Sequence, residues 1–400
     1  MAVSTVRIEK VVAEGDGLAR LDDGRVVFVE GGLPGELVNI RIVKQSRDYA
    51  RAVALEVVEA SADRVDPFCP NVARGCGGCD LQHANLELQR RIKVDIVRES
   101  LTRIGRLSDP FVTLGANHCA GSGYRTTIRV ARNHDARSTG RVGFRRRGSH
   151  EVVEVDACPI SHPVLSDLLL DVRAEHDVDD VAIRYSVATG ETTWWAEPNS
   201  GVTGLAGASG PAARLTERVA GRDFTVSAGS FFQSSPEAAE ILVDSVRRAL
   251  GDPREWPAGD VVDAYSGIGL FAALAVPADR QVIAIESNPW ACADARENLR
   301  DRRAVVVESR VDDWTPHECA VVIADPSRDG LRSSGVAVLA STGAAVIVLV
   351  SCDPASLGRD ARQLVETGYD FASAEVLDLF PQTHHVEVVS RFVRRERLER

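Results

Sequence analysis

The sequence has no apolar run long enough to cross a membrane. A membrane-spanning helix needs about 20 consecutive apolar residues, and no apolar stretch in these 400 residues approaches that length. The first ten residues, MAVSTVRIEK, lack the apolar core of a secretory signal. With 44% hydrophobic and 26% charged residues, the composition is that of a globular protein. We therefore expect a cytoplasmic protein with no membrane partner, and nothing calls for an oligomer, so we expect a monomer.

The chain also lacks an excess of positive charge, since its formal net charge is −11. Taken alone, this sum argues against a nucleic-acid partner, but local charge matters more than the total. Residues 121–150 hold eight arginines and a single acid, Asp135, which sums to +7. Arginine is suited to forked contacts with phosphate, so this segment predicts an RNA-binding surface; the alternative is a solvated strand face. The arginines that we single out are Arg125, Arg129, Arg145, Arg146 and Arg147.

Three stretches with different hydrophobic patterns divide the chain into expected domains. Residues 1–60 alternate in short apolar runs with turns at intervals of about 8–12 residues, which predicts a small OB-like β-barrel. Residues 61–255 mix helical and strand patterns, which predicts a central α+β domain that carries a cysteine set. Residues 256–400 alternate near-continuous apolar strands with helical segments, which predicts a parallel, doubly wound, Rossmann-like α/β domain.

A glycine-bearing loop opens the C-terminal region. The segment DAYSGIGLFAA, residues 263–273, follows a predicted strand and begins a predicted helix. Gly267 and Gly269 permit a tight turn and a close ligand, and the helix N-terminus offers free N–H groups. Glu286 ends the next strand, where a carboxylate can accept both hydroxyls of a ribose. The loop predicts an adenine nucleoside ligand and leaves open whether it is NAD or S-adenosylmethionine.

Further polar residues follow the ends of later strands. Asp325 ends one strand in VVIADPSRDGL, and Cys352 ends the next in LVSCDPASLGRD. The segment LFPQTHHVEVV then brings His384, His385 and Glu387. In an open α/β sheet ligands bind at the carboxyl ends of the strands, so one carboxylate and one thiol should meet the nucleoside loop. The alternatives are a core cysteine at a strand end and a solvated surface acid.

Four other cysteines have the spacing of a metal site. Cys69, Cys76 and Cys79 follow the pattern C-x6-C-x2-C, and Cys158 lies far downstream. In the reducing cytoplasm such a set more often indicates metal binding or catalysis than disulfides. Four thiolates hold either zinc or a [4Fe–4S] cluster, and the spacing does not choose between them. The remaining cysteines are interpreted as small hydrophobic residues: Cys119, Cys292 and Cys319.

The order of these motifs resembles that of the S-adenosylmethionine-dependent RNA uracil-C5 methyltransferases. The match is closest to the iron–sulfur branch that carries an N-terminal TRAM barrel and acts on 23S ribosomal RNA. The matching pieces span nearly the whole chain and are, in order, the barrel, the cysteine set, GYR, VGF, FFQ, DAYSGIGLF, IE, ADPSRDGL, VSCDPASLGRD and FPQTHHVE.

The resemblance implies a role for each candidate residue. Cys352 would add to carbon 6 of uracil as the nucleophile, and Glu387 would be the base that permits elimination. The residues that would contact the cofactor S-adenosylmethionine are Gln233, Tyr265, Gly267, Gly269, Glu286 and Asp325. The resemblance also favours an iron–sulfur cluster over zinc at the four cysteines.

The chain departs from the family pattern at five positions, where it carries Ser235, Ser266, Leu270, Ser309 and Ser327. These departures bear on cofactor affinity and leave the nucleophile and base in place. We predict an RNA uracil-C5 methyltransferase and favour 23S rRNA over tRNA because the chain has both the barrel and the cysteine set. The rivals are a tRNA methyltransferase, an NAD-linked iron–sulfur oxidoreductase and an RNA-binding protein that has lost catalysis.

Overall fold

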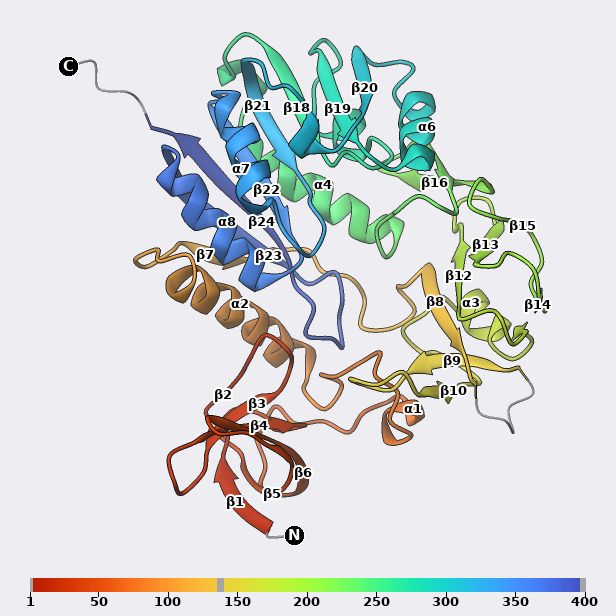
Figure 1. Ribbon diagram of the computed structural model, residues 1–400, viewed down its shortest axis with the longest axis vertical. Helices are drawn as coiled ribbons and strands as arrows, with labels where there is room; N and C mark the ends of the chain where they lie inside the picture. The colour runs from red at the N-terminus through yellow and green to blue at the C-terminus, as the bar shows by residue number, and fades with distance from the viewer. Residues whose placement is uncertain (1–2, 135–139, 396–400) are drawn as a thin grey trace.

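The computed structural model describes residues 3–134 and 140–395, and Figure 1 shows how their elements are arranged. Arg137 and Asp135, both counted in the arginine-rich segment, lie outside the described residues. Within the described part of the chain, no helix has the length and apolar character that a membrane span requires. The N-terminal strands and the C-terminal sheet lie at opposite ends of the view.

The N-terminal strands form one six-stranded sheet in the order β1-β5-β6-β4-β3-β2. Its strands are β1 (Val3–Arg7), β2 (Lys10–Val11), β3 (Gly17–Arg20), β4 (Val26–Glu30), β5 (Leu37–Gln45) and β6 (Tyr49–Glu59). Alternate residues are buried: Val27 and Val29 of β4 and Val38 and Ile40 of β5 lie in one core. This period of two is the one read from the sequence, so the expected N-terminal β unit is present.

The middle of the chain builds a second six-stranded sheet in the order β10-β9-β8-β12-β13-β15. Its strands are β8 (Thr127–Arg132), β9 (Val142–Arg145), β10 (Val152–Glu154), β12 (Asp180–Tyr185), β13 (Thr192–Ala196) and β15 (Ala208–Ser209). The other elements of this region are α1 (Pro70–Ala73), α2 (Leu86–Arg103), β7 (Val112–Leu114), α3 (Pro163–Leu168), β11 (Arg173–Ala174), β14 (Val202–Thr203), β16 (Arg214–Val219) and β17 (Arg222–Ser227). The arginine-rich segment supplies β8 and β9, as expected for strands.

The C-terminal sheet has eight strands in the order β20-β19-β18-β21-β22-β24-β23-β7. They include β18 (Asp260–Ala264), β19 (Val282–Glu286), β20 (Ala304–Glu308), β21 (Cys319–Ala324), β22 (Val346–Ser351), β23 (Tyr369–Leu377) and β24 (Glu387–Arg394). The five strands from β20 to β22 are parallel, but β24 runs antiparallel to both of its neighbours. The expected parallel strands are therefore present, and the antiparallel strand β24 was not predicted. The loop 378–386 is too short for a crossover connection, so β24 returns beside β23 as a hairpin.

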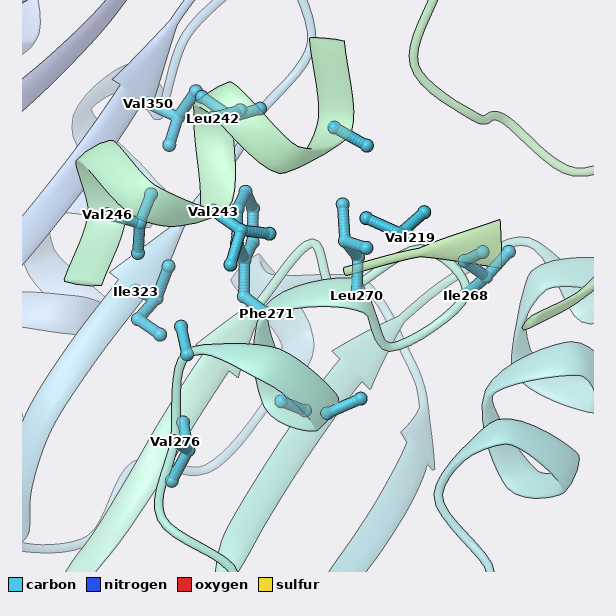
Figure 2. Close-up of a cluster of buried hydrophobic side chains, with 14 of the residues drawn as sticks. Val219, Leu242, Val243, Val246, Ile268, Leu270, Phe271, Val276, Ile323 and Val350 are labelled. Atoms are coloured by element: carbon cyan, nitrogen blue, oxygen red, sulfur yellow. The ribbon is translucent and has the colours of Figure 1, made fainter. Parts of the chain in front are cut away.

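Helices cover both faces of this sheet. They are α4 (Pro236–Leu250), α5 (Leu270–Leu274), α6 (Pro289–Asn298), α7 (Arg332–Ser341) and α8 (Pro354–Glu366), with short turns η1 (Pro253–Glu255) and η2 (Val311–Asp313). Figure 2 shows Leu242, Val243 and Val246 of α4 beside Ile323 and Val350 of the sheet. The side chain of Ser235 caps α4 by accepting the Ala238 N–H, and Pro236 begins the helix.

Two elements from residues 61–255 belong to this C-terminal assembly. Helix α2 packs against α8 on the second face of the sheet, and β7 pairs with β23 at its edge. The segment after the cysteines therefore packs against the C-terminal sheet and its helix α8. The division into three domains at residues 60 and 255 stays a proposal, because these packing contacts cross the second boundary.

Candidate active site and cysteine cavity

The glycine loop adopts the left-handed backbone that its glycines allow. Strand β18 ends at Ala264, and Tyr265, Gly267 and Gly269 follow with φ angles of 60°, 53° and 85°. A Cβ at Gly269 would lie 3.0 Å from the side chain of Leu299, so this position needs glycine for space as well as for conformation. The loop thus turns tightly into α5, as the sequence predicts.

Glu286 holds this loop from the end of the neighbouring strand β19. Its Oε2 accepts a hydrogen bond from the Gly267 N–H at 3.0 Å, and its Oε1 accepts from the N–H groups of Ser287 and Asn288, each at 2.7 Å. The carboxylate is only partly buried and lines a cavity beside the loop. A ribose bound there would meet a carboxylate that is already oriented.

One cavity of 810 Å³ collects almost all the predicted catalytic and cofactor residues. Its walls include Gln233, Tyr265, Gly267, Glu286, Asp325, Cys352 and Glu387. They come from the ends of β18, β19, β21 and β22, from the start of β24 and from the segment before α4. Gly269 does not line the cavity; it is the residue immediately before α5.

Cys352 lies between β22 and α8 and is half-buried. The next residue, Asp353, caps α8 by accepting the Ser356 N–H at 2.7 Å, which fixes the turn that presents the thiol. Burial raises the pKa of the Cys352 thiol to about 12, and the nearby carboxylates of Glu387 and Asp325 add to this rise. The free protein therefore holds Cys352 as a thiol.

Two buried carboxyl groups face that thiol. Burial raises the pKa of Asp325 to about 7, and it raises the pKa of Glu387 well above its ordinary range, with Asp325 adding to the rise. Like charges close together in a dry site do not both ionise readily. Near neutral pH these two acids therefore supply both a carboxylate and a protonated carboxyl beside Cys352.

Several wall residues were not among the predicted site residues. Phe231 is 70% exposed and lines the cavity within the FFQ motif, and Arg328 lines it within ADPSRDGL. His385 also lines the wall, and burial lowers its pKa to about 3, so its ring is neutral. The quoted motifs contain all three residues, but no pattern within each motif assigns them a role.

Two buried polar atoms of the cavity wall have no hydrogen-bond partner in the described part of the chain. They are the hydroxyl oxygen of Ser266 and Oδ1 of Asp312. Buried polar groups are rarely left without partners, so both atoms suit contacts to a polar ligand. Ser309, Ser327 and Leu270 line the same wall, whereas Ser235 caps α4 away from it. Four of the five departures from the family pattern thus face the cavity.

The four clustered cysteines line a second, smaller cavity of 40 Å³. Its walls include Cys69, Cys76, Cys79 and Cys158, and none of them forms a disulfide. Burial raises the pKa of Cys79 to about 12, and the neighbouring thiols add to the rise. Among residues 3–134 and 140–395, however, no set of cysteine, histidine or acidic side chains has the arrangement of a metal-ion site. The predicted metal site therefore stays a proposal.

The segment that carries Cys69, Cys76 and Cys79, called the cysteine segment below, is joined to the arginine-rich strands. The Gly77 N–H donates to the Arg145 carbonyl at 3.0 Å, and Cys76 forms a β-bridge with Arg146. A Cβ at Gly77 would lie 2.5 Å from the Arg147 nitrogen, so only glycine allows this approach. Three other cysteines are buried and do not line the four-cysteine cavity: Cys119, Cys292 and Cys319.

Comparison with known proteins identifies the family. Residues 2–55 match a TRAM domain, and residues 293–395 match the tRNA (Uracil-5-)-methyltransferase family. An uncharacterized RNA methyltransferase of Streptomyces avermitilis is 34% identical over 96% of each chain. A 23S rRNA (uracil(1939)-C(5))-methyltransferase of Chromohalobacter salexigens is 32% identical over 95% of this chain and 87% of its own.

The chain belongs to the RNA uracil-5 methyltransferase family. The solved structure of Pyrococcus abyssi tRNA (uracil-54, C5)-methyltransferase, in complex with S-adenosyl-L-homocysteine, shares the fold. It has a TM-score of 0.72, 23% identity and coverage of 98% of this chain and 100% of its own. The predicted enzyme class, an S-adenosylmethionine-dependent RNA uracil-C5 methyltransferase, is confirmed. The rival interpretations as an oxidoreductase or a binding protein are set aside.

The five arginines predicted to bind RNA are not equivalent in this methyltransferase. Arg145 pairs with Asp180 at 2.7 Å, and the next two arginines pair with Glu151 and Asp16. By contrast, no described side chain forms an ion pair or hydrogen bond with the guanidinium groups of Arg125 and Arg129. Arg125 also lines both cavities, so it lies where they meet. The RNA-binding role of all five stays a prediction.

Proposed function

We propose that this methyltransferase modifies a uridine of 23S rRNA through a covalent adduct to Cys352. The observation that carries the proposal is that one cavity brings Cys352 and Glu387 together with the nucleoside loop and Glu286. These residues lie far apart in the sequence, and the carboxyl edge of the sheet gathers them. The second cavity, which the four clustered cysteines line, has neither acids nor a nucleoside-type loop in its wall.

The chemistry proceeds by addition, transfer and elimination. The Cys352 sulfur forms a bond to carbon 6 of uracil, the proton of the thiol passes to a carboxylate, and the C5–C6 π electrons move to make carbon 5 nucleophilic. S-adenosylmethionine supplies the methyl group that carbon 5 takes. Once Asp325 is neutral, Glu387 releases its own proton to solvent and, as a carboxylate, removes the proton from carbon 5. The C5–C6 double bond re-forms, the sulfur–carbon 6 bond breaks, and Asp325 returns a proton to the thiolate.

The raised pKa of Glu387 suits this role. A carboxylate whose pKa lies well above its ordinary range is a stronger base than an exposed one. Asp325 sits next to it, and its own raised pKa allows it to take up the thiol proton near neutral pH. The remaining wall residues would orient the two substrates: Glu286 and Tyr265 on the nucleoside side, and Gln233 on the segment before α4.

The sequence relatives support 23S rRNA as the substrate. Three related proteins named 23S rRNA uracil-C5 methyltransferases are 30–32% identical over 95–98% of this chain. The tRNA enzyme from Pyrococcus abyssi shares the fold at 23% identity, which is too distant to assign a substrate. The TRAM domain and the cysteine set also fit the ribosomal branch that the sequence resembles.

We further propose that the four-cysteine cavity holds a [4Fe–4S] cluster. Gln82 Nε2 and Ser161 Oγ are buried, line this cavity and have no partner among the described side chains and backbone groups. Both atoms could donate hydrogen bonds to cluster sulfides. The thiols surround a cavity instead of converging on one point, which suits a cluster bound at its corners better than one tetrahedral zinc ion. The cluster would supply a rigid anchor for the surrounding segments.

The proposal is tested with transcripts of 23S rRNA and tRNA that carry 5-fluorouridine. Fluorine cannot leave carbon 5 as a proton does, so elimination stalls and the adduct persists. We expect a protein–RNA band that survives denaturation, requires S-adenosylmethionine, forms on the 23S transcript and is absent with Cys352→Ala. A band on the tRNA transcript alone would reassign the substrate, and a band that persists with Cys352→Ala would overturn the proposed nucleophile.

A further inference from the structure

The loop 378–386 carries much of the wall around the proposed base. Phe380, His385 and Val386 line the large cavity, and Glu387 follows as the first residue of β24. A displacement of this loop would therefore move Glu387 relative to Cys352. Misplacing a catalytic group by about 1 Å can cost about 100-fold in rate, so the contacts that hold the loop bear on the reaction.

The centre of the loop is a residue with an unfavourable backbone conformation. Gln382 has φ = 73°, in the left-handed region that residues with a side chain rarely adopt. Its N–H donates to Oε1 of Gln89 at 2.7 Å, and its carbonyl accepts from the Leu81 N–H at 3.0 Å. Gln89 Nε2 also donates to Oε1 of Gln382 at 3.0 Å. Helix α2 and the segment before it thus fix this conformation.

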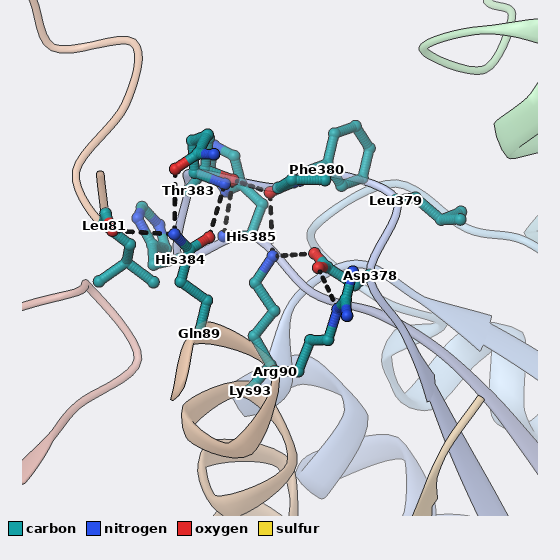
Figure 3. Close-up of polar contacts among 12 residues, drawn as sticks. Leu81, Gln89, Arg90, Lys93, Asp378, Leu379, Phe380, Thr383, His384 and His385 are labelled. Carbon is teal, nitrogen blue, oxygen red and sulfur yellow. Dashed lines mark hydrogen bonds and ion pairs between the residues drawn. The ribbon is translucent and has the colours of Figure 1, made fainter. Parts of the chain in front are cut away.

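Helix α2 also holds the start of the loop. Figure 3 shows Lys93 reaching from the helix to Asp378 and to the carbonyl of Phe380. Lys93 Nζ lies 2.7 Å from Oδ1 of Asp378 and 2.9 Å from the Phe380 oxygen, and Arg90 lies 3.2 Å from Oδ2 of Asp378. Lys93 and Asp378 are both fully buried. A buried charge is tolerated only with such partners, so this contact strongly restricts where the loop can lie.

Asp80 holds the end of the loop. It follows Cys79 directly, its Oδ1 accepts the His384 N–H at 2.8 Å, and its Oδ2 pairs with Nδ1 of His384. The His384 ring lies 4.3 Å from the ring of His385, which faces the cavity. The turn between β2 and β3 covers the pair, because a Cβ at Gly15 in this turn would lie 2.8 Å from Oδ2 of Asp80. Asp80 and His384 therefore connect the cysteine segment to His385 in the cavity wall.

We propose that Asp80 and Gln89 are positioning residues for methyl transfer, through which the cysteine segment and α2 hold the loop 378–386 in place. Neither residue lines the large cavity, so neither touches the substrates. The inference rests on the proposed role of Glu387 as the base. It implies that the cysteine site, although outside the cavity, governs the rate of elimination and leaves the affinity for RNA and cofactor largely unchanged.

The test measures Asp80→Ala and Gln89→Ala with a 23S rRNA transcript that contains ordinary uridine. We expect kcat to fall by about 10- to 100-fold, while the dissociation constants for the transcript and for S-adenosylhomocysteine change by less than about 3-fold. Because addition precedes the step that uses Glu387, a covalent protein–RNA band should accumulate in both variants. Asp80→Asn keeps an acceptor for the His384 N–H, so we expect it to recover part of the lost rate.

The matched control is Asp63→Asn. Asp63 lies shortly before Cys69 in the chain, but it bonds to Asn85 and Arg91 and not to the loop 378–386. We therefore expect the kcat of Asp63→Asn to match that of the wild type. Hydrogen–deuterium exchange of the peptide covering 378–387 should be faster in Asp80→Ala and Gln89→Ala than in the control. Wild-type kcat in the two alanine variants, or a loss confined to RNA affinity, overturns the inference. A wild-type protein that forms neither methylated RNA nor adduct overturns the proposed function itself.

Discussion

Cys352 and Cys79 have similarly raised pKa values but different neighbouring groups. Burial raises both to about 12. Beside Cys352 the further contribution comes from the carboxylates of Glu387 and Asp325, in a cavity of 810 Å³. Beside Cys79 it comes from other thiols around a cavity of 40 Å³. The same shift therefore marks two kinds of site, which the neighbours of each thiol distinguish.

The difference indicates how each thiol becomes an anion. Carboxylates next to a thiol can accept its proton when a substrate arrives, so Cys352 is equipped to become a nucleophile. A bound cation would favour joint deprotonation of thiols that lie next to one another, which fits the ligand role proposed for Cys79 and its neighbours. The neighbours of a cysteine, more than its pKa, separate these two functions.

The largest expected effect comes from removing the thiol of Cys352. We expect Cys352→Ser to lower methyl transfer to a 23S rRNA transcript by at least about 1,000-fold, because the hydroxyl is a far weaker nucleophile and leaving group. Cys79→Ser should retain measurable activity, since Cys79 does not line the large cavity. Transfer of labelled methyl groups measures both. A Cys352→Ser variant with more than a tenth of wild-type activity would contradict the assignment.

The next effect concerns the four-cysteine cavity. We expect Cys79→Ala to lose most of the bound iron and to lower the melting temperature by roughly 5–10 °C, because a bound cluster stabilises the folded state. The control is Cys319→Ala, a buried cysteine outside the cavity, which should keep its iron and lose only a few degrees. Iron analysis and anaerobic thermal unfolding measure the two quantities. Unchanged iron content in Cys79→Ala would contradict the cluster proposal.

Arg125, which lines both cavities, tests whether they share an RNA surface. We expect Arg125→Ala to weaken binding of the 23S transcript by about 10-fold and to reduce the salt slope by about one, as for the loss of one phosphate contact. Arg145→Ala should have a smaller effect, because Arg145 already pairs with Asp180 at 2.7 Å. Filter binding at several salt concentrations compares the two. A larger loss with Arg145→Ala would reverse the comparison.

The sequence predicted the site better than it predicted the sheet. Glycine turns and strand-end residues are local features, so the loop at Gly267 was predicted correctly. The position of β24 depends on which strands pair, and that is a long-range property. The prediction therefore missed the antiparallel hairpin that brings Glu387 to the cavity, although it selected Glu387 itself.

Ion pairs between distant segments were also beyond the sequence. The run Arg145–Arg147 looked like free positive charge, but partners at Asp180, Glu151 and Asp16 come from other strands and loops. Likewise, nothing near Asp80 in the sequence points to His384, more than 300 residues later. Such contacts depend on the packing of the N-terminal sheet, α2 and the C-terminal sheet against one another.

A smaller effect should appear in the reactivity of Cys352. The Asp325 carboxylate raises the pKa of the thiol, so Asp325→Asn should lower that pKa and speed alkylation by iodoacetamide at pH 8 several-fold. The control, Glu366→Gln, changes an exposed acid at the far end of α8 and should leave the rate unchanged. Mass spectrometry of the peptide containing Cys352 follows the reaction. Slower alkylation in Asp325→Asn would show that the sign is wrong.

The smallest effect concerns a buried acid of β18. Asp263 is fully buried, its Oδ2 accepts the Ala272 N–H at 2.9 Å, and burial raises its pKa to about 7. The folded protein keeps this proton up to about pH 7, whereas the unfolded chain releases it near pH 4, so stability falls as the pH rises between these values. We expect Asp263→Asn to raise the melting temperature by a few degrees at pH 8 and to change it little at pH 4. A rise at pH 4 alone would contradict this.

The most direct test of the central claim is the fate of ordinary RNA on Glu387→Gln. The variant keeps Cys352 but lacks the base, so it should add to uracil, accept the methyl group and then stall before elimination. We predict a covalent protein–RNA band with an unmodified 23S rRNA transcript and S-adenosylmethionine, lost when Cys352→Ala is added. Normal turnover by Glu387→Gln, or a band that survives in the double variant, would contradict the account.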